Sequence, residues 1–418
     1  MRSPALAAGF LLALSATALA HESPRVLTLT HCWRMALKQS EEIALRAELI
    51  TETEGRLQQA LSGILPKLSF SSVDKRQDGN GSSAFTQKNV PERKFTFSQP
   101  LFSGFKEFAA MRGSQSEKQL REQEKARAEQ LLLVDVSDAY HFLLEQRDEI
   151  GALDSIRQTL RNRLAELEVR EKIGRSRPSE RVAAQAQLYR VEAEWEQAQT
   201  RETIASQLLQ FLTGLDAVGE LADPGPSLPA AGPPESYLAK ADTRPDVKAA
   251  EQSAQIARQE LKVARAKFFP TVSTEGNYYV ERAGAAKEVA WDASLKVDVP
   301  LFRGGETMGA NRVAESGVRQ ADLKLRETKR KAAQEIRDAH ADYEGALARV
   351  RALTKAVEAT DESYQLQEQE YSRSLVNNLE VLSALQTLQD SRRELIRARY
   401  EALRLYWKLK AAAGESLL

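Results

Sequence analysis

The sequence repeats itself at an offset of 200 residues, and this duplication constrains the fold more than any other feature. Pro100-Leu101-Phe102 recurs as Pro300-Leu301-Phe302, and Glu180 recurs as Glu380. Further matches are Gly104 with Gly304, Asp138-Ala139 with Asp338-Ala339, Leu153 with Leu353, and Leu188 with Leu388. Because the offset holds over about 90 residues without drift, we interpret the chain as two copies of one supersecondary unit.

Each copy contains a stretch that is typical of a very long helix. Residues 106–172 lack proline, and residues 305–374 repeat this pattern. A helix of this length extends roughly 100 Å, far beyond the diameter of a compact domain. We therefore expect shorter helices to stack end to end beside each long one. The expected ranges are about 30–62 and 179–213 in the first copy, and about 244–267 and 377–412 in the second.

Strand patterns precede each long helix. Residues 289–299 alternate between an apolar face and a charged or polar face, and residues 94–101 do likewise. With weaker partners, they predict one hairpin at about 66–102 and another at about 270–302. Strands of this kind suit either a half-buried soluble sheet or a membrane barrel. Four strands cannot close a membrane barrel, and hydrocarbon does not tolerate open edges, so a membrane location would require several chains.

The last helix carries two adjoining apolar seams. One recurs every seven residues from Val381 to Leu409, and the other contains Leu382, Ile396 and Leu403, with Gln389 interrupting it. Two seams allow a helix to contact a neighbour on each side, as in a curved wall of helices. An ordinary bundle helix is the alternative for this segment.

The N-terminus has the features of a secretory signal at residues 1–20. Basic Arg2 precedes an apolar core, and Ala18-Leu19-Ala20 stands immediately before His21. We expect the mature chain to begin near His21, outside the cytoplasm. No later run of about 18 apolar residues predicts a membrane helix. Cys32 is the only cysteine, so an internal disulfide is excluded.

Charge and composition argue against several classes of function. Lys plus Arg and Asp plus Glu both number 59, so whole-chain charge makes no case for nucleic acid. No metal-ligand spacing, phosphate loop or catalytic motif is found in the sequence, and we expect neither a cofactor nor enzyme activity. The two repeats, 21–213 and 244–418, flank residues 214–243, whose five prolines predict an irregular linker without regular helix.

Local motifs point to a known family. Each long helix is preceded by Pro-Leu-Phe-x-Gly, at residues 100–104 and 300–304. Turn motifs at 171–174 and 370–374 are followed by returning helices that begin around Glu180-Arg181-Val182 and Glu380-Val381-Leu382. In order, spacing and duplication, the mature chain resembles the TolC family of outer-membrane efflux channels. The resemblance implies a mainly α fold with a small β part: a homotrimer whose shared 12-stranded outer-membrane β-barrel continues into a periplasmic α-helical barrel.

The resemblance also implies a function. It predicts an outer-membrane exit channel of a tripartite efflux or type I secretion system, which passively conducts substrates. Its partners would be a periplasmic membrane-fusion adaptor, an inner-membrane pump of RND, ABC or MFS type, and outer-membrane lipid. The cargo, whether drug, metal ion or protein, is left open. A soluble periplasmic coiled-coil adaptor or scaffold is the alternative.

In this family the helix-turn-helix tips form the closed entrance and the adaptor contact. Glu380 matches an acidic residue near the start of the returning helix, whereas Ser383 replaces a second acid and Val376 replaces a base. Threefold symmetry would place three copies of Glu380 near the axis as a cation filter. Glu380 as a carboxylate that stabilises the helix N-terminus is the alternative. The candidate docking residues are Gly174, Arg175, Ser176, Ser374, Val376, Asn377 and Asn378.

Overall fold

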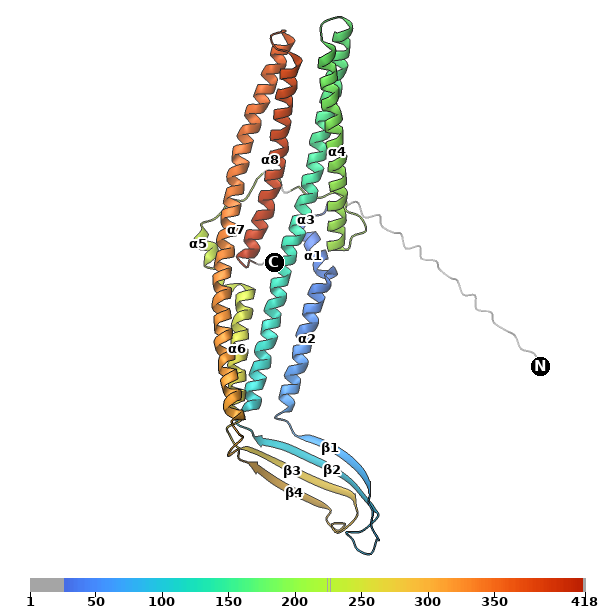
Figure 1. Cartoon of the computed structure of the whole chain (residues 1–418), viewed down its shortest axis with the longest axis vertical. Coiled ribbons are helices and arrows are strands. Elements are labelled where there is room, and N and C mark those ends of the chain that lie inside the picture. Colours follow the sequence, from blue (N-terminus) through green and yellow to red (C-terminus); the bar gives the residue numbers. More distant parts are fainter. Residues whose placement is uncertain (1–25, 224, 226, 416–418) are drawn as a thin grey trace, which may run out of the picture.

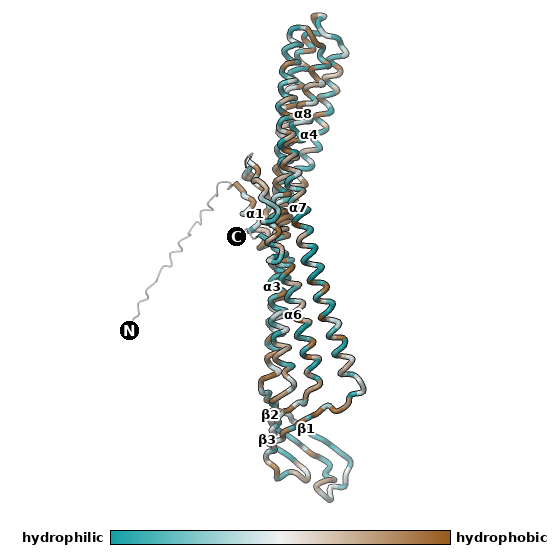
Figure 2. Tube along the Cα trace, turned by 90° about the vertical axis from the view of Figure 1, so that its left-hand side faces the viewer, coloured by the Kyte–Doolittle hydropathy of each residue, from teal (hydrophilic) through white to brown (hydrophobic). Residues whose placement is uncertain are grey.

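The computed structural model describes residues 26–223, 225 and 227–415, so the predicted signal at 1–20 lies outside the described residues. The described chain is a long rod of helices with a four-stranded sheet at one end (Figure 1). Seen edge on, the helical wall is thin, and α1 (Leu29–Gln39) lies on one side of it near mid-length (Figure 2).

The two long helices have equal lengths at the offset of the sequence repeat. Helix α3 spans Lys106–Lys172 and α7 spans Glu306–Ser372, and each contains 67 residues. Shorter helices lie beside them and together extend along most of their length. These are α2 (Glu41–Ser62), α4 (Pro178–Thr213), α6 (Pro245–Ala266) and α8 (Asn378–Ala412).

The expectation of one continuous helix at about 30–62 is wrong, because the chain breaks at Ser40. The Ser40 N–H donates to Ala36 O at 2.8 Å and closes α1, while Ser40 Oγ accepts from Ile43 N at 3.4 Å and opens α2. Glu41 and Glu42 follow in the first turn, where the helix dipole favours negative charge. The sequence Ser40-Glu41-Glu42 therefore has the pattern of a helix N-terminus.

The linker at 214–243 is more ordered than its prolines suggested. It contains the short helix α5 (Pro234–Leu238) and a 3-10 turn at Ala241–Thr243. The expectation that proline rules out helix here is wrong, since Pro234 occupies a first-turn position, where its missing N–H costs nothing. Side chains from α7 hold the linker: His340 Nε2 lies 2.8 Å from Gly232 O, and the Tyr343 hydroxyl donates to Pro229 O.

The sheet joins the two repeats directly. Strands β1 (Lys67–Arg76), β2 (Asn89–Phe102), β3 (Thr271–Arg282) and β4 (Trp291–Asp298) pair in sequence order, all antiparallel. The hairpins of the two copies therefore meet through β2 and β3. Large apolar side chains remain exposed, among them Leu68, Phe97, Tyr278, Trp291 and Leu295. Within one chain, β1 and β4 are the edge strands of this sheet.

The helices near the sheet form a single layer in the order α2, α3, α6, α7 (Figure 1). Farther from the sheet, α3 pairs with α4 and α7 pairs with α8, and α8 also packs on α3. The two-seam prediction for α8 is confirmed. From one seam, Leu382 joins a cluster with α3 and α4, and Leu403 joins a cluster with α1 and α3. From the other seam, Ala402 and Leu409 join a cluster with α7.

Within the described part of the chain, no helix combines the length and apolarity that crossing a bilayer demands.

Candidate pore entrance and docking tips

The helical hairpins α3–α4 and α7–α8 end together at the end of the rod farthest from the sheet (Figures 1 and 2). Their turns have the same backbone geometry. Gly174 has φ 74° and Ser374 has φ 61°, both left-handed. Arg175 N donates to Arg170 O at 2.8 Å, and Leu375 N donates to Glu370 O at 2.9 Å. Each pattern satisfies carbonyl groups left free at a helix C-terminus.

The two returning helices begin differently. Helix α4 starts with Pro178 and has no side-chain cap, whereas Asn377 Oδ1 caps α8 by accepting from Leu379 N at 2.9 Å and Glu380 N at 3.2 Å. Asn377 Nδ2 also donates to Glu380 Oε1 at 3.2 Å. Glu380 therefore stabilises the start of α8, as a carboxylate in a capping arrangement does.

Glu380 and Ser383 line the same groove. It lies between α7 and α8 next to the tip and encloses about 350 Å³. Its other side chains are mostly small and polar: Thr360, Ser363, Gln367, Ala384 and Thr387. Glu380 is the only charged residue among them, and it remains exposed. Sequence reasoning missed the polar partners, although Thr360 with Gln367, and Glu380 with Thr387, are spaced by seven residues.

The predicted docking residues differ in accessibility. Gly174, Arg175, Ser374 and Asn377 are exposed. Ser176 and Val376 are half-buried, and Ser176 Oγ donates to Glu180 Oε2 at 2.8 Å. Asn378 is fully buried, and its amide has no hydrogen-bond partner among the described residues. The Asn378 side chain is thus closed to a partner protein in this conformation.

Exposed apolar side chains at the tips were not anticipated from the sequence. Ile173 is 61% exposed, Leu375 70% and Leu379 53%. Each of the two tips therefore presents apolar surface to a partner, and on the first tip this surface lies next to the charged Arg175 in sequence. The sequence signal was present, since all three residues interrupt the polar turns.

Tyr371 links the second tip to the first. Its ring, from the last turn of α7, contacts two guanidinium groups of α3, with the ring centroid 4.7 Å from Arg163 Cζ and 4.8 Å from Arg170 Cζ. The ring is buried, which raises the pKa of the Tyr371 hydroxyl. Glu166 pairs with both arginines, at 2.9 and 2.7 Å, and holds them in position. Cation–π contacts of this kind stabilise by about 1 kcal/mol each.

A buried ion cluster fixes the two hairpins farther from the tips. Glu149 of α3 is 2% exposed and accepts from Arg393 at 2.7 Å and from Arg397 at 2.6 Å, both on α8. Arg393 also pairs with Glu194 of α4. Burial acts to raise the pKa of Glu149, but the hydrogen bonds from the two arginines outweigh it and lower the pKa. Among the described residues, no cluster of His, Cys, Asp or Glu is arranged to hold a metal.

The duplicated strand hairpins, the paired long helices and the twin tips together define a class, the outer-membrane efflux channels. The model of one family, described as "Outer membrane efflux protein", matches residues 239–415, which cover nearly all of the second repeat.

Curated relatives extend the match to the first repeat. The alkaline protease secretion protein AprF of Pseudomonas aeruginosa is 23% identical over 95% of this chain and 86% of its own length. The outer membrane protein TolC of Vibrio cholerae is 24% identical over 69% of each chain.

Solved structures establish the fold over nearly the whole length. The outer membrane protein VceC of Vibrio cholerae has a TM-score of 0.81 at 22% identity and covers 93% of this chain and 97% of its own. The open-state MtrE channel of Neisseria gonorrhoeae has a TM-score of 0.78 at 19% identity and covers 94% of this chain and 90% of its own. The chain therefore shares the fold of these solved outer-membrane proteins over nearly its whole length.

Proposed function

We propose that three copies of this chain conduct cargo passively from the periplasm across the outer membrane, with the Glu380 groove at the pore entrance. The observation that carries this assignment is the groove itself, which places an exposed carboxylate among neutral polar groups beside the tip. Transport needs no catalytic chemistry from this chain, because the energy comes from an inner-membrane pump. Fractionation tests the location: heat-modifiable trimers in the outer membrane support the proposal, and release with periplasmic contents contradicts it.

The entrance acts as a weak cation filter. Threefold symmetry brings three Glu380 carboxylates around one axis, and rings of carboxylates favour cations. Ser383 contributes a hydroxyl where a second carboxylate would double the charge. We therefore infer moderate cation selectivity and moderate block by multivalent cations.

The tips dock a periplasmic adaptor. Exposed Arg175 and Asn377 flank the apolar Ile173, Leu375 and Leu379, so the surface combines apolar contact with polar anchoring. Arg175→Cys and Asn377→Cys place reactive thiols there, while Cys32 is fully buried and its pKa is raised to about 11 by burial. Crosslinking of either thiol to the cognate adaptor supports the assignment. The control is Lys248→Cys on α6; equal yields from tip and control would contradict it.

The tips also form the gate. Tyr371 and Leu382 tie the α7–α8 hairpin to α3, so separating the hairpins breaks two cation–π contacts and an apolar cluster. We infer that the described conformation has its two tips locked together within one chain. Opening then requires these contacts to break, a cost that adaptor binding offsets.

The names of two relatives favour an exported protein as the cargo of this channel. AprF, named for alkaline protease secretion, aligns with 95% of this chain, and PrtF of Dickeya chrysanthemi, named for protease secretion, is 30% identical over 29% of it. We propose an ABC-type pump as partner on this basis. Deletion of the gene followed by mass spectrometry of the culture medium tests it: loss of a secreted protein supports the proposal, and loss of drug or metal tolerance with an unchanged secretome contradicts it.

A further inference from the structure

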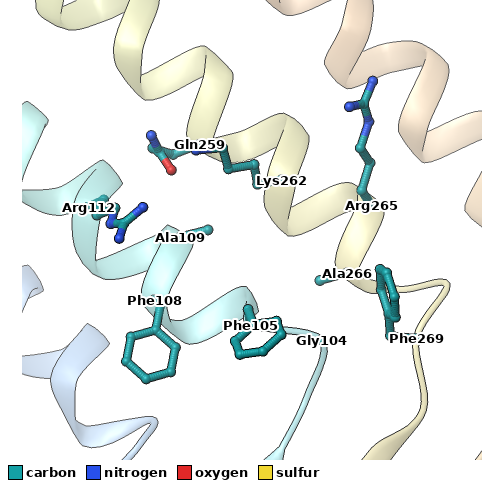
Figure 3. A pocket seen from close by; sticks show the side chains of 10 residues that line it. All are labelled: Gly104, Phe105, Phe108, Ala109, Arg112, Gln259, Lys262, Arg265, Ala266 and Phe269. Carbon is teal, nitrogen blue, oxygen red and sulfur yellow. The ribbon is translucent and has the colours of Figure 1, made fainter.

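A cavity lies where the helices meet the sheet (Figure 3). It encloses about 540 Å³ between the start of α3 and the end of α6 (Figure 3). Gly104, at φ 68°, lets the turn before α3 approach α6 closely, since a Cβ there would lie 2.7 Å from Ala266 O. Gly104 recurs at the repeat offset as Gly304, where an added Cβ would meet no atom of the same chain.

The cavity has an apolar floor and a basic rim. Phe105, Phe108 and Phe269 supply aromatic rings that are 65%, 48% and 53% exposed. Membrane β-barrels carry girdles of aromatic residues at both membrane–water interfaces, and these three rings lie at the corresponding border of the sheet.

The rim carries three cations and no acidic side chain. Arg112 projects from α3, and Lys262 and Arg265 project from α6. Arg265 contacts Glu315 at 3.4 Å, whereas Arg112 and Lys262 have no ion-pair partner within the residues that the structure describes. Figure 3 shows the Arg265 side chain directed away from the cavity toward α7, where Glu315 lies. The two remaining positive charges, Arg112 and Lys262, and the apolar floor complement an anionic amphiphile, which has a charged end and a hydrocarbon end.

The position of the cavity leaves it open in the trimer. Its walls, α3 and α6, are the inner pair of the four-helix layer, so subunit contacts fall on α2 and α7. In Figure 3 the helices run from α2 on the left to α7 on the right, which is the reverse of their order in Figure 1, so the two figures show opposite faces of the helical layer. The cavity is seen on the face shown in Figure 3. Figure 2 shows that α1 lies on this same face. A second layer such as α1 would block a lumen, and this face is therefore the outer one.

We propose that this cavity binds an anionic phospholipid of the periplasmic leaflet. The phosphate lies between Arg112 and Lys262, and the acyl chains extend over the aromatic floor toward the lipid-facing strands. The proposal rests on the outer-membrane location described above. A lipid headgroup bound at the junction between sheet and helices holds this junction at the membrane surface and thereby sets the depth of the trimer in the bilayer.

Native mass spectrometry of the detergent-purified trimer tests the site with phosphatidylglycerol and phosphatidylcholine as probes. Phosphatidylglycerol should bind three per trimer and more tightly than phosphatidylcholine. Lys262→Gln should weaken phosphatidylglycerol binding about fivefold, as expected for one cation near an anionic lipid. Lys262→Arg keeps the charge and should retain binding. Lys248→Gln, exposed on the same helix about 21 Å away by helical rise, is the matched control.

Two further results separate a lipid from free phosphate. Phe108→Ala should weaken phosphatidylglycerol binding, and millimolar inorganic phosphate should not displace it. Equal affinity for the two lipids, or equal losses from Lys262→Gln and Lys248→Gln, would overturn the proposal. Displacement by inorganic phosphate would also overturn it. The same mass spectra report whether each variant is still a trimer. Single-channel conductance is measured separately, so a failure of the lipid proposal can be told apart from a failure of the proposed channel function.

Discussion

Gly174 and Ser374 occupy the same left-handed position at the two tips, at φ 74° and 61°, although only one of them is a glycine. A side chain in this conformation costs about 1 kcal/mol. Gly174→Ser should therefore speed local opening of the first tip about fivefold. Hydrogen exchange at the Arg175 amide, which donates to Arg170 O, measures this directly. Gly151→Ser, at a helical glycine with free space around it, should leave that exchange rate unchanged.

Tyr371 between Arg163 and Arg170 gives a prediction about gating. Tyr371→Ala removes both cation–π contacts and should lower the cost of separating the tips by about 2 kcal/mol. The variant channel should then show more frequent or longer openings in planar bilayers. Tyr371→Phe keeps the ring and should behave like the natural protein. Identical open probabilities for the Ala and Phe variants would contradict a role for the ring.

Glu149 gives a prediction about stability. Glu149→Gln leaves Arg393 and Arg397 facing a neutral amide in a buried site, which should cost about 3 kcal/mol. Thermal unfolding followed by circular dichroism should show a clearly lower midpoint. Glu192→Gln breaks the more exposed pair with Arg161 and should cost less than about 1 kcal/mol. Similar midpoints for the two variants would contradict a stabilising role of the buried cluster.

His141 gives a prediction about pH. Burial, together with nearby Arg404, lowers the pKa of this imidazole to about 4, and Nδ1 lies 2.8 Å from Ser137 O. Below pH about 6.5 the unfolded chain binds a proton at His141 that the native state does not accept until about pH 4. Stability should therefore fall by about 3 kcal/mol as the pH drops through this interval.

Unfolding midpoints of His141→Gln and the natural protein at several pH values test this contribution. The variant should lose less stability between pH 6.5 and 4 than the natural protein. His31→Gln, at an exposed position on α1, is the control and should follow the natural curve. Parallel curves for natural protein and His141→Gln would contradict the assignment.

The repeat and the long helices could be read from the sequence because each rests on local pattern. The absence of proline and a seven-residue period are visible without tertiary information, and α8 has the two-sided packing that its seams predicted. The break at Ser40 was missed because its neighbours are strong helix formers, and a single capping residue decided the outcome.

The site was only partly predictable for a different reason. Glu380 was found through its motif, but Thr360 and Gln367 reach the same groove from α7, across a contact that only the tertiary fold creates. Tyr371 lies in the turn motif at 370–374, yet its partners Arg163 and Arg170 are about 200 residues distant in sequence. Long-range side-chain contacts of this kind leave no periodic signal in a single sequence.

The most direct test of the channel and its entrance is single-channel recording from the purified trimer in planar bilayers. Discrete conductance steps, cation selectivity, and block by multivalent cations added on the tip side are predicted. Glu380→Gln should reduce both selectivity and block, because it removes three carboxylates from the entrance while keeping the shape of the side chain. Absence of conductance would contradict the channel, and unchanged selectivity and block in Glu380→Gln would contradict Glu380 at its entrance.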